Sequence, residues 1–191
     1  LPTHFQFLPG FHEIQTNFQN TENTILILLD CGDPERVGDE TFFSWAKTKK
    51  SIVLDHHQTE KPFGTWVYVD PSASATGEIV FQLSRYLPVQ PGAEFATCIY
   101  TAIFTDTGGF RFSNTTSSAL QICGELVEMG ANPQKIAEEV YENVEPERFL
   151  LLGEVLSRME IHQGGKVSLI TIRKEDLARY HLNDHSLEGF I

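Results

Sequence analysis

Acidic and imidazole side chains follow apolar segments at three points of the chain. Asp30 ends one short apolar run, and the triplet Asp55-His56-His57 ends the next one. Asp106 opens a third polar cluster, Asp-Thr-Gly-Gly-Phe-Arg, after a longer apolar segment. Oxygen and imidazole ligands without a thiolate favour Mn²⁺ or Mg²⁺, with Fe or Co as further options, over a structural zinc ion. If the three clusters converge, they predict a two-metal centre for phosphoryl transfer.

Each of these residues also has a purely structural alternative. An aspartate after a strand commonly forms a turn or caps a helix, so Asp30 alone is a weak sign of chemistry. Asp106 could likewise cap the turn after its own helix. Two consecutive histidines flanked by Asp55 directly after an apolar strand seldom serve packing alone. The triplet Asp55-His56-His57 is therefore the strongest indication of a functional site.

The apolar runs predict the strands of a parallel sheet. Residues 25–30 and 51–55 are continuous apolar runs that end in polar residues, as buried parallel strands do. Residues 40–50 are long enough for the helix of a right-handed crossover between them, and residues 66–69 indicate a third strand. Open parallel sheets bind ligands at the carboxyl ends of their strands. The first two polar clusters would therefore meet at one edge of the sheet.

The second half of the chain is predicted to be mostly helical. Apolar spacing, proline starts and glycine ends indicate helices at 77–87, 93–105, 117–129, 133–143 and 146–158. After Gly164-Gly165, residues 167–172 alternate like a strand, and residues 174–180 indicate a short helix.

These elements predict an α/β fold with a parallel sheet flanked by helices, followed by the start of a second α/β domain. We place the first domain at 1–161 and the linker and start of the second domain at 162–191, with the boundary near Ile161 to Gly165. No internal repeat is apparent in the sequence.

Composition limits the classes of function. The 191 residues include 14 Lys and Arg against 26 Asp and Glu, and the net charge of −12 disfavours a broad grip on long duplex nucleic acid. The apolar runs are far shorter than the roughly 18 residues that a membrane-spanning helix needs. Three widely spaced cysteines indicate neither a disulfide framework nor a thiolate zinc site. We therefore expect a globular cytoplasmic protein without membrane contact, and the sequence is compatible with a homodimer.

Four motifs occur in a fixed order along the chain. They are Leu-Asp-Cys-Gly-Asp at 29–33, Leu-Asp-His-His at 54–57, Asp-Pro-Ser-Ala-Ser-Ala-Thr-Gly-Glu at 70–78, and Thr-Asp-Thr-Gly-Gly-Phe-Arg-Phe-Ser-Asn-Thr at 105–115. Together they resemble the motifs of the DHH phosphoesterase family. The last motif is most similar to the bacterial oligoribonuclease and phosphoadenosine-phosphate phosphatase branch. The resemblance extends from about Phe7 to the end of the chain.

The resemblance implies a role for each residue of the first, second and fourth motifs that could do chemistry. Asp30 matches the carboxylate that bridges two Mn²⁺ ions, and His56 and Asp106 match ligands of the second ion. His57 matches the histidine that contacts substrate phosphate. Asp55 resembles an acid that orients the neighbouring imidazole, as carboxylates beside metal-bound histidines often do.

Arg111 is a candidate phosphate clamp, because a guanidinium group can donate two hydrogen bonds to one phosphate. Its alternative is an ordinary surface arginine.

The activity implied by the resemblance is that of a Mn²⁺-dependent hydrolase, a phosphoesterase with exonuclease activity, in which Mg²⁺ or Co²⁺ could replace Mn²⁺. Two metal ions would turn a bound water into hydroxide and screen the charge on the phosphate oxygens. The implied substrates are short 5′-phosphorylated oligonucleotides or 3′,5′-bisphosphorylated adenosine. Pyrophosphate, polyphosphate or cyclic dinucleotides are an alternative substrate class. A degenerate metal- or nucleotide-binding module is a third hypothesis.

The chain departs from the family at both ends. The family's first motif, a histidine followed by two closely spaced aspartates ahead of the Asp30 strand, is absent, and His4 and His12 lack such aspartates. The glycine-rich Gly-Gly-Gly-His signature of the family would lie beyond Ile191. We therefore expect this chain to match the middle of a longer protein whose upstream residues supply the first motif. By itself it would lack normal turnover.

Overall fold

The structure is a computed structural model that describes residues 3–15, 24–32, 50–58, 63–143 and 145–187. The chain divides into two compact units. One consists of residues 5–137, and the other of residues 138–191 together with residues 1–4. The predicted crossover helix at 40–50 lies outside the described residues, apart from Lys50.

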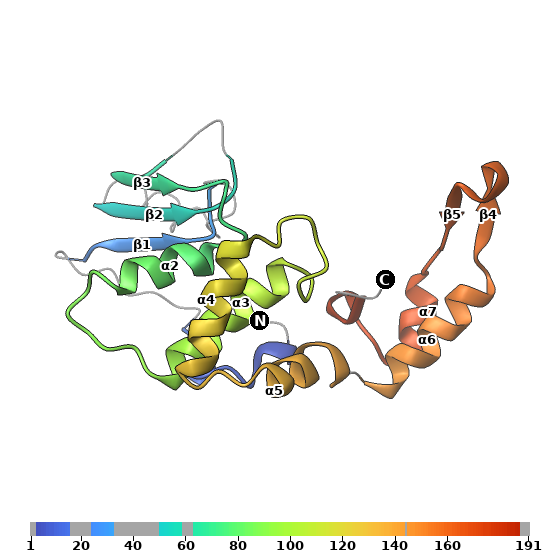
Figure 1. The fold of residues 1–191 in the computed structure, drawn as a ribbon. Coiled ribbons are helices and arrows are strands. Elements are labelled where there is room, and N and C mark those ends of the chain that lie inside the picture. Colours follow the sequence, from blue (N-terminus) through green and yellow to red (C-terminus); the bar gives the residue numbers. More distant parts are fainter. Residues whose placement is uncertain (1–2, 16–23, 33–49, 59–62, 144, 188–191) are drawn as a thin grey trace. The chain divides into compact units, whose positions relative to one another are not determined.

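A three-stranded parallel sheet forms one layer of the first unit (Figure 1). Its strands are β1 (Leu26–Leu29), β2 (Ser51–Asp55) and β3 (Trp66–Val69), in that spatial order. Because the strands run parallel, with Leu29 opposite Leu54, the residues that follow β1 and end β2 lie at the same edge. The parallel sheet with its flanking helices confirms the predicted α/β fold.

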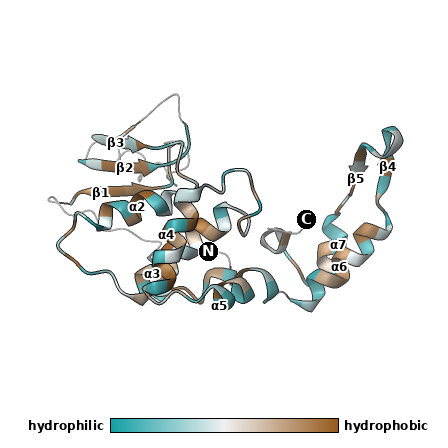
Figure 2. Ribbon diagram, in the orientation of Figure 1, coloured by the Kyte–Doolittle hydropathy of each residue, from teal (hydrophilic) through white to brown (hydrophobic). Residues whose placement is uncertain are grey.

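The sheet presents alternate residues to its two faces, as the twofold period of a strand requires. Leu26, Leu28 and Val53 are buried together in one core cluster, whereas Ile27 and Leu29 are exposed. β1 is hydrophobic along its whole length (Figure 2).

One helix of the first unit packs against the sheet, and two further helices pack against that helix. They are α2 (Thr76–Ser84), which contacts β2, α3 (Ala93–Asp106), and α4 (Ser117–Glu128). α3 contacts both α2 and α4, and it buries residues on several sides, as its predicted apolar character requires. α4 begins at a cap in which the Thr116 hydroxyl accepts from the Ala119 amide.

Two predicted helices of this unit end earlier than expected. α2 ends at Ser84 rather than at residue 87. α5 covers only Pro133–Ala137, and a π-helical segment (η4, Glu138–Glu142) follows it, in which the Asn143 amide bonds to the Glu138 carbonyl. The i→i+5 bond of a π-turn is a change of backbone geometry that apolar periodicity does not reveal. Two short 3-10 segments, η1 (Thr3–Phe5) and η2 (Phe11–Glu13), lie near the amino terminus.

The second unit is built from α6, a short antiparallel hairpin and α7. Leu151, Val155 and Leu177 form its core, so α6 packs against α7. The compact unit therefore includes α6 and begins ahead of the boundary that the sequence placed near Ile161. Residues 160–162 form a strand that the sequence analysis did not predict. The assignment of 1–161 and 162–191 to two family domains stays a prediction. The elements are α6 (Pro146–Ser157), β4 (Glu160–His162), η5 (Gln163–Gly165), β5 (Val167–Leu169), α7 (Lys174–Arg179) and η6 (Asp184–Leu187).

Within the described ranges, every helix falls short of the length and hydrophobicity that crossing a bilayer would require.

Candidate metal centre

Asp30 lies at the point where β1 ends, and two contacts fix it there. Its backbone has a φ of 58°, in the left-handed region that aspartate tolerates better than most residues. Its amide donates to the Leu54 carbonyl at 3.0 Å. Its Oδ1 accepts from the Thr76 hydroxyl at the start of α2 at 2.8 Å. The side chain is about half exposed, so the carboxylate remains accessible.

His56 is oriented by a backbone carbonyl. Its Nδ1 lies 3.2 Å from the Ala73 carbonyl oxygen. Because a carbonyl can only accept, Nδ1 carries the proton in the neutral ring and Nε2 keeps its lone pair. Nε2 lies 3.6 Å from Asp30 Oδ1 and 3.5 Å from Asp106 Oδ2. It is buried and has no hydrogen-bond partner in the part of the chain that the structure describes. A buried imidazole lone pair between two carboxylates fits a metal ligand.

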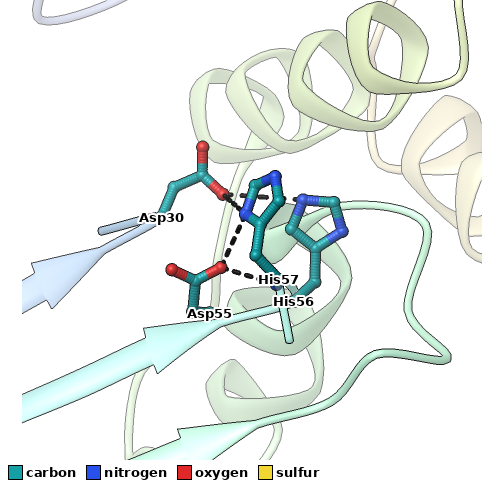
Figure 3. A group of neighbouring side chains, drawn as sticks. All are labelled: Asp30, Asp55, His56 and His57. Carbon is teal, nitrogen blue, oxygen red and sulfur yellow. Dashed lines mark hydrogen bonds and ion pairs between the residues drawn. The ribbon is translucent and has the colours of Figure 1, made fainter. Parts of the chain in front are cut away.

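Asp55 orients the imidazole ring of His57 and lies below it in Figure 3. The Asp55 side chain is fully buried, and its Oδ1 accepts from the His57 amide at 2.7 Å and from His57 Nδ1 at 2.8 Å. Burial alone would raise the pKa of Asp55, but the hydrogen bonds and the charge of His57 outweigh it and lower that pKa. With Nδ1 bonded to Asp55, the half-exposed ring directs Nε2 away from this contact.

Asp106 is the last residue of α3, and its carboxylate faces His56. Burial and then the charge of Asp30 raise the pKa of Asp106, against the opposing effect of the two imidazoles. A carboxylate that is costly to ionise beside another carboxylate is stabilised by a bound cation. The environment of Asp106 therefore also fits a metal ligand.

One ligand atom from each of Asp30, Asp55, His56 and His57 lies within 4.8 Å of every other in this group. This close group includes Asp55 and His57, and Asp106 adjoins it through His56. The three residues predicted as metal ligands, Asp30, His56 and Asp106, are thus brought together at one edge of the sheet. Carboxylate oxygens and imidazole are a donor set that suits Mn²⁺ or Mg²⁺.

Arg111 belongs to the tight turn that follows Asp106. Gly108, Gly109 and Phe110 all have positive φ, and the Arg111 Nε donates to the Gly108 carbonyl at 2.6 Å. Part of the guanidinium group therefore fastens the turn. Its predicted contact with phosphate stays a prediction.

Residues 4–103 match the N-terminal domain of the DHH family. The chain belongs to the DHH family. This match confirms the family that the four motifs indicated, and it covers the Asp30 and Asp55-His56-His57 motifs directly.

The relatives agree with the predicted branch of the DHH family. The chain is 35% identical over 165 residues to the bifunctional oligoribonuclease and PAP phosphatase NrnA of Thermus thermophilus, covering 86% of this chain and 49% of that protein. It is 30% identical over 182 residues to the Bacillus subtilis protein of the same name, covering 91% and 54%. The chain thus spans about half the length of the curated relatives it matches.

A solved structure also has the same fold. An exopolyphosphatase-related protein from Bacteroides fragilis superimposes with a TM-score of 0.89 at 28% identity, covering 100% of this chain and 59% of that one.

The structure adds two DHH-domain residues whose contacts with the candidate ligands were not predicted. The Ala73 carbonyl orients His56, and the Thr76 hydroxyl holds Asp30. Both lie in the third motif, which we used only as a sign of the family. The third motif is a run of small polar residues between a strand and a helix, and this pattern could have indicated that the Thr76 hydroxyl makes a hydrogen bond there. A backbone carbonyl such as that of Ala73 leaves no signal in the residue type.

Proposed function

We propose that this chain is the metal-binding part of a phosphoesterase that hydrolyses short 5′-phosphorylated oligonucleotides, 3′,5′-bisphosphorylated adenosine, or both. The observation that carries the proposal is the His56 Nε2 atom, which is buried, has no hydrogen-bond partner in the described chain, and faces Asp30 and Asp106. The names of the Thermus and Bacillus relatives support the choice of substrate.

Asp30, His56 and Asp106 would hold the metal in this proposal, which would be Mn²⁺, with Mg²⁺ or Co²⁺ as substitutes. When bound, such ions lower the pKa of a coordinated water and screen the charge that develops on phosphate oxygens. Every other contribution comes from the protein.

His57 would bind the substrate phosphate. Asp55 accepts a hydrogen bond from His57 Nδ1, so an imidazolium form of His57 would present Nε2–H on the side away from Asp55. A charge-assisted bond from this group to a phosphate oxygen would orient the phosphorus and stabilise the added negative charge. Arg111, a predicted phosphate clamp, would assist in the same way.

A second candidate is the hydrolysis of pyrophosphate or polyphosphate at the same site. The similarity to the exopolyphosphatase-related protein from Bacteroides fragilis favours it. A site that recognises phosphate through an imidazole and a metal ion held by carboxylates does not need a nucleobase. The two candidates therefore differ only in the group attached to the phosphate, which is a nucleoside in one and a further phosphate in the other.

The test uses the complete gene product that contains this chain. It is incubated with Mn²⁺ and, in separate reactions, a 5′-phosphorylated dinucleotide, 3′,5′-bisphosphorylated adenosine, pyrophosphate and a cyclic dinucleotide. We expect mononucleotide release from the dinucleotide, and its loss by at least about 100-fold in Asp106→Ala. Glu94→Ala is the matched control, because Glu94 is an exposed carboxylate at the other end of α3.

Three outcomes would count against parts of the proposal. Phosphate release from pyrophosphate alone would favour the second candidate. Retained activity in Asp106→Ala would remove Asp106 from the metal centre. If the protein binds Mn²⁺ but hydrolyses none of these substrates, only the hypothesis of a metal-binding module without catalytic activity would remain.

A further inference from the structure

Ser74 is held on both sides of its backbone by Glu78 and Asn114, whose side chains are not among the candidate metal ligands. Glu78 is 2% exposed, and its Oε1 accepts from the Ser74 amide at 2.7 Å and from the Ser74 hydroxyl. The other oxygen of Glu78 accepts from the Ser118 hydroxyl at 3.3 Å, at the start of α4. The buried carboxylate thus ties Ser74 to two helices.

Asn114 holds the other side of Ser74. Its Nδ2 donates to the Ser74 carbonyl at 3.1 Å and to the Asp106 carbonyl at 3.1 Å. Both partners are carbonyl oxygens, so only the NH₂ group of the amide can face them, and the orientation of the side chain is determined by chemistry. Asn114 therefore joins the segment around Ser74 to the end of α3.

The segment that these two residues hold is the one that orients the candidate ligands. Ala73, directly before Ser74, offers its carbonyl to His56 Nδ1, and Thr76, two residues after it, donates its hydroxyl to Asp30. Asp106, the third candidate ligand, has its own carbonyl bonded to Asn114. All three ligands are thus linked to one short stretch of backbone.

We propose that Glu78 and Asn114 are positioning residues that set the geometry of the metal centre through Ser74. The fixed Ala73 carbonyl keeps the proton of His56 on Nδ1 and so leaves Nε2 free to bind metal. The part of this inference that concerns metal rests on the proposed function, whereas the part that concerns the His56 tautomer does not.

The first measurement needs no metal. Long-range ¹H–¹⁵N spectra of the imidazole rings, recorded in EDTA at a pH of about 8.5, above the ordinary histidine pKa, report which nitrogen carries the proton. His56→Gln assigns the signals. We expect the Nδ1–H tautomer for His56 in the wild-type chain and in Asn143→Ala, a control that removes an exposed asparagine of the other unit. In Asn114→Ala we expect a shift toward the Nε2–H form.

The second measurement is the affinity for Mn²⁺, from the electron paramagnetic resonance signal of the free ion. We expect Asn114→Ala to weaken binding by about 10- to 100-fold, as the loss of a group that orients metal ligands commonly does. Glu78→Gln should keep most of the affinity, because its amide oxygen can accept from Ser74 while its NH₂ donates to the Ser118 hydroxyl. Glu78→Ala should lose affinity for Mn²⁺, because alanine can make neither hydrogen bond. Circular dichroism in EDTA checks that each variant is folded.

Folded Asn114→Ala and Glu78→Ala chains with the wild-type His56 tautomer and unchanged Mn²⁺ affinity would overturn the proposal. A wild-type complete gene product that binds no Mn²⁺, together with loss of the Nδ1–H tautomer in Asn114→Ala, would overturn the proposed metal centre while supporting the positioning role. The two failures are therefore distinguishable.

Discussion

Replacement of Gly108 by alanine tests the turn that follows Asp106. Gly108 has a φ of 58°, which costs a residue with a side chain about 1–2 kcal/mol. A Cβ added to Gly108 would also lie 2.5–2.7 Å from three atoms of the Phe112 ring. That ring is 57% exposed and can rotate away. The contact therefore adds little to the free-energy cost of the left-handed backbone conformation. We expect Gly108→Ala to lower the free energy of unfolding by about 1–2 kcal/mol.

Gly124 provides a matched control within the same compact unit. It lies inside α4, and a Cβ added to it would meet no atom within 4 Å. Gly124→Ala should therefore raise the free energy of unfolding by up to about 1 kcal/mol, through better helix propensity. The two variants should differ by about 1–3 kcal/mol, which urea unfolding followed by circular dichroism resolves.

A further variant separates the two causes. The double variant Gly108→Ala/Phe112→Ala removes the ring, so any destabilisation relative to Phe112→Ala alone belongs to the backbone. Equal stability of Gly108→Ala and Gly124→Ala would refute the reasoning, because the left-handed turn would then not be the native conformation. In that case the proposed placement of Arg111 beside the Gly108 carbonyl would also fail.

Three other predictions follow from the titration behaviour of buried groups. Because burial and Asp30 raise the pKa of Asp106, ionised Asp106 destabilises the metal-free chain. Asp106→Asn should raise the free energy of unfolding in EDTA at pH 7 by about 0.5 kcal/mol, a figure reduced for solvent screening because the side chain is 39% exposed. The gain should vanish below the ordinary aspartate pKa, where both states are protonated. Burial would raise the pKa of Asp55, but the hydrogen bonds from His57 outweigh burial and lower it. The Asp55 carboxylate therefore stabilises the fold above the ordinary aspartate pKa. This stabilisation is lost as the pH falls through the lowered pKa. Asp55→Asn should therefore cost about 1–2 kcal/mol at pH 7 in urea unfolding, and less in acid. Burial, and then Glu78, raises the pKa of the Cys123 thiol to about 12, so iodoacetamide at pH 8 should alkylate Cys123 in urea but not in the native chain, as mass spectrometry of its peptide would show.

The strands and the edge of the sheet could be predicted from sequence because their signals are local. The run at 51–55 is apolar up to Asp55, and β2 has the same bounds. The rule that parallel strands bind ligands at their carboxyl ends then sufficed to bring Asp30 and His56 together. Position along the chain was enough, because each residue directly ends or follows a strand.

The contacts that orient the ligands could not be predicted in the same way. The bond between Thr76 and Asp30 joins residues that are 46 positions apart, and the bond from Asn114 to Ser74 joins residues that are 40 apart. Such contacts depend on how α2 and α3 pack, and that packing is decided by side-chain volumes across the whole unit. In the hairpin at 160–169, β5 lies within a segment that was predicted as a strand. β4 was not predicted, because three residues are too few to establish a periodic pattern.

Two buried polar atoms without a hydrogen-bond partner argue that this edge of the sheet is a binding site and not scaffold. Buried polar atoms in proteins nearly always have a hydrogen-bond partner. Yet His56 Nε2 and Asp55 Oδ2 are both buried without one among the described residues, and nearby Asp106 has a raised pKa. Burying such groups together costs stability, and a fold selected only for stability would replace them. A divalent cation would satisfy the Nε2 lone pair and offset the repulsion between Asp106 and Asp30 at once. The features that destabilise the metal-free chain are therefore the ones expected to give it metal affinity. Asp106→Asn should separate these two effects, because it should raise the free energy of unfolding and weaken Mn²⁺ binding.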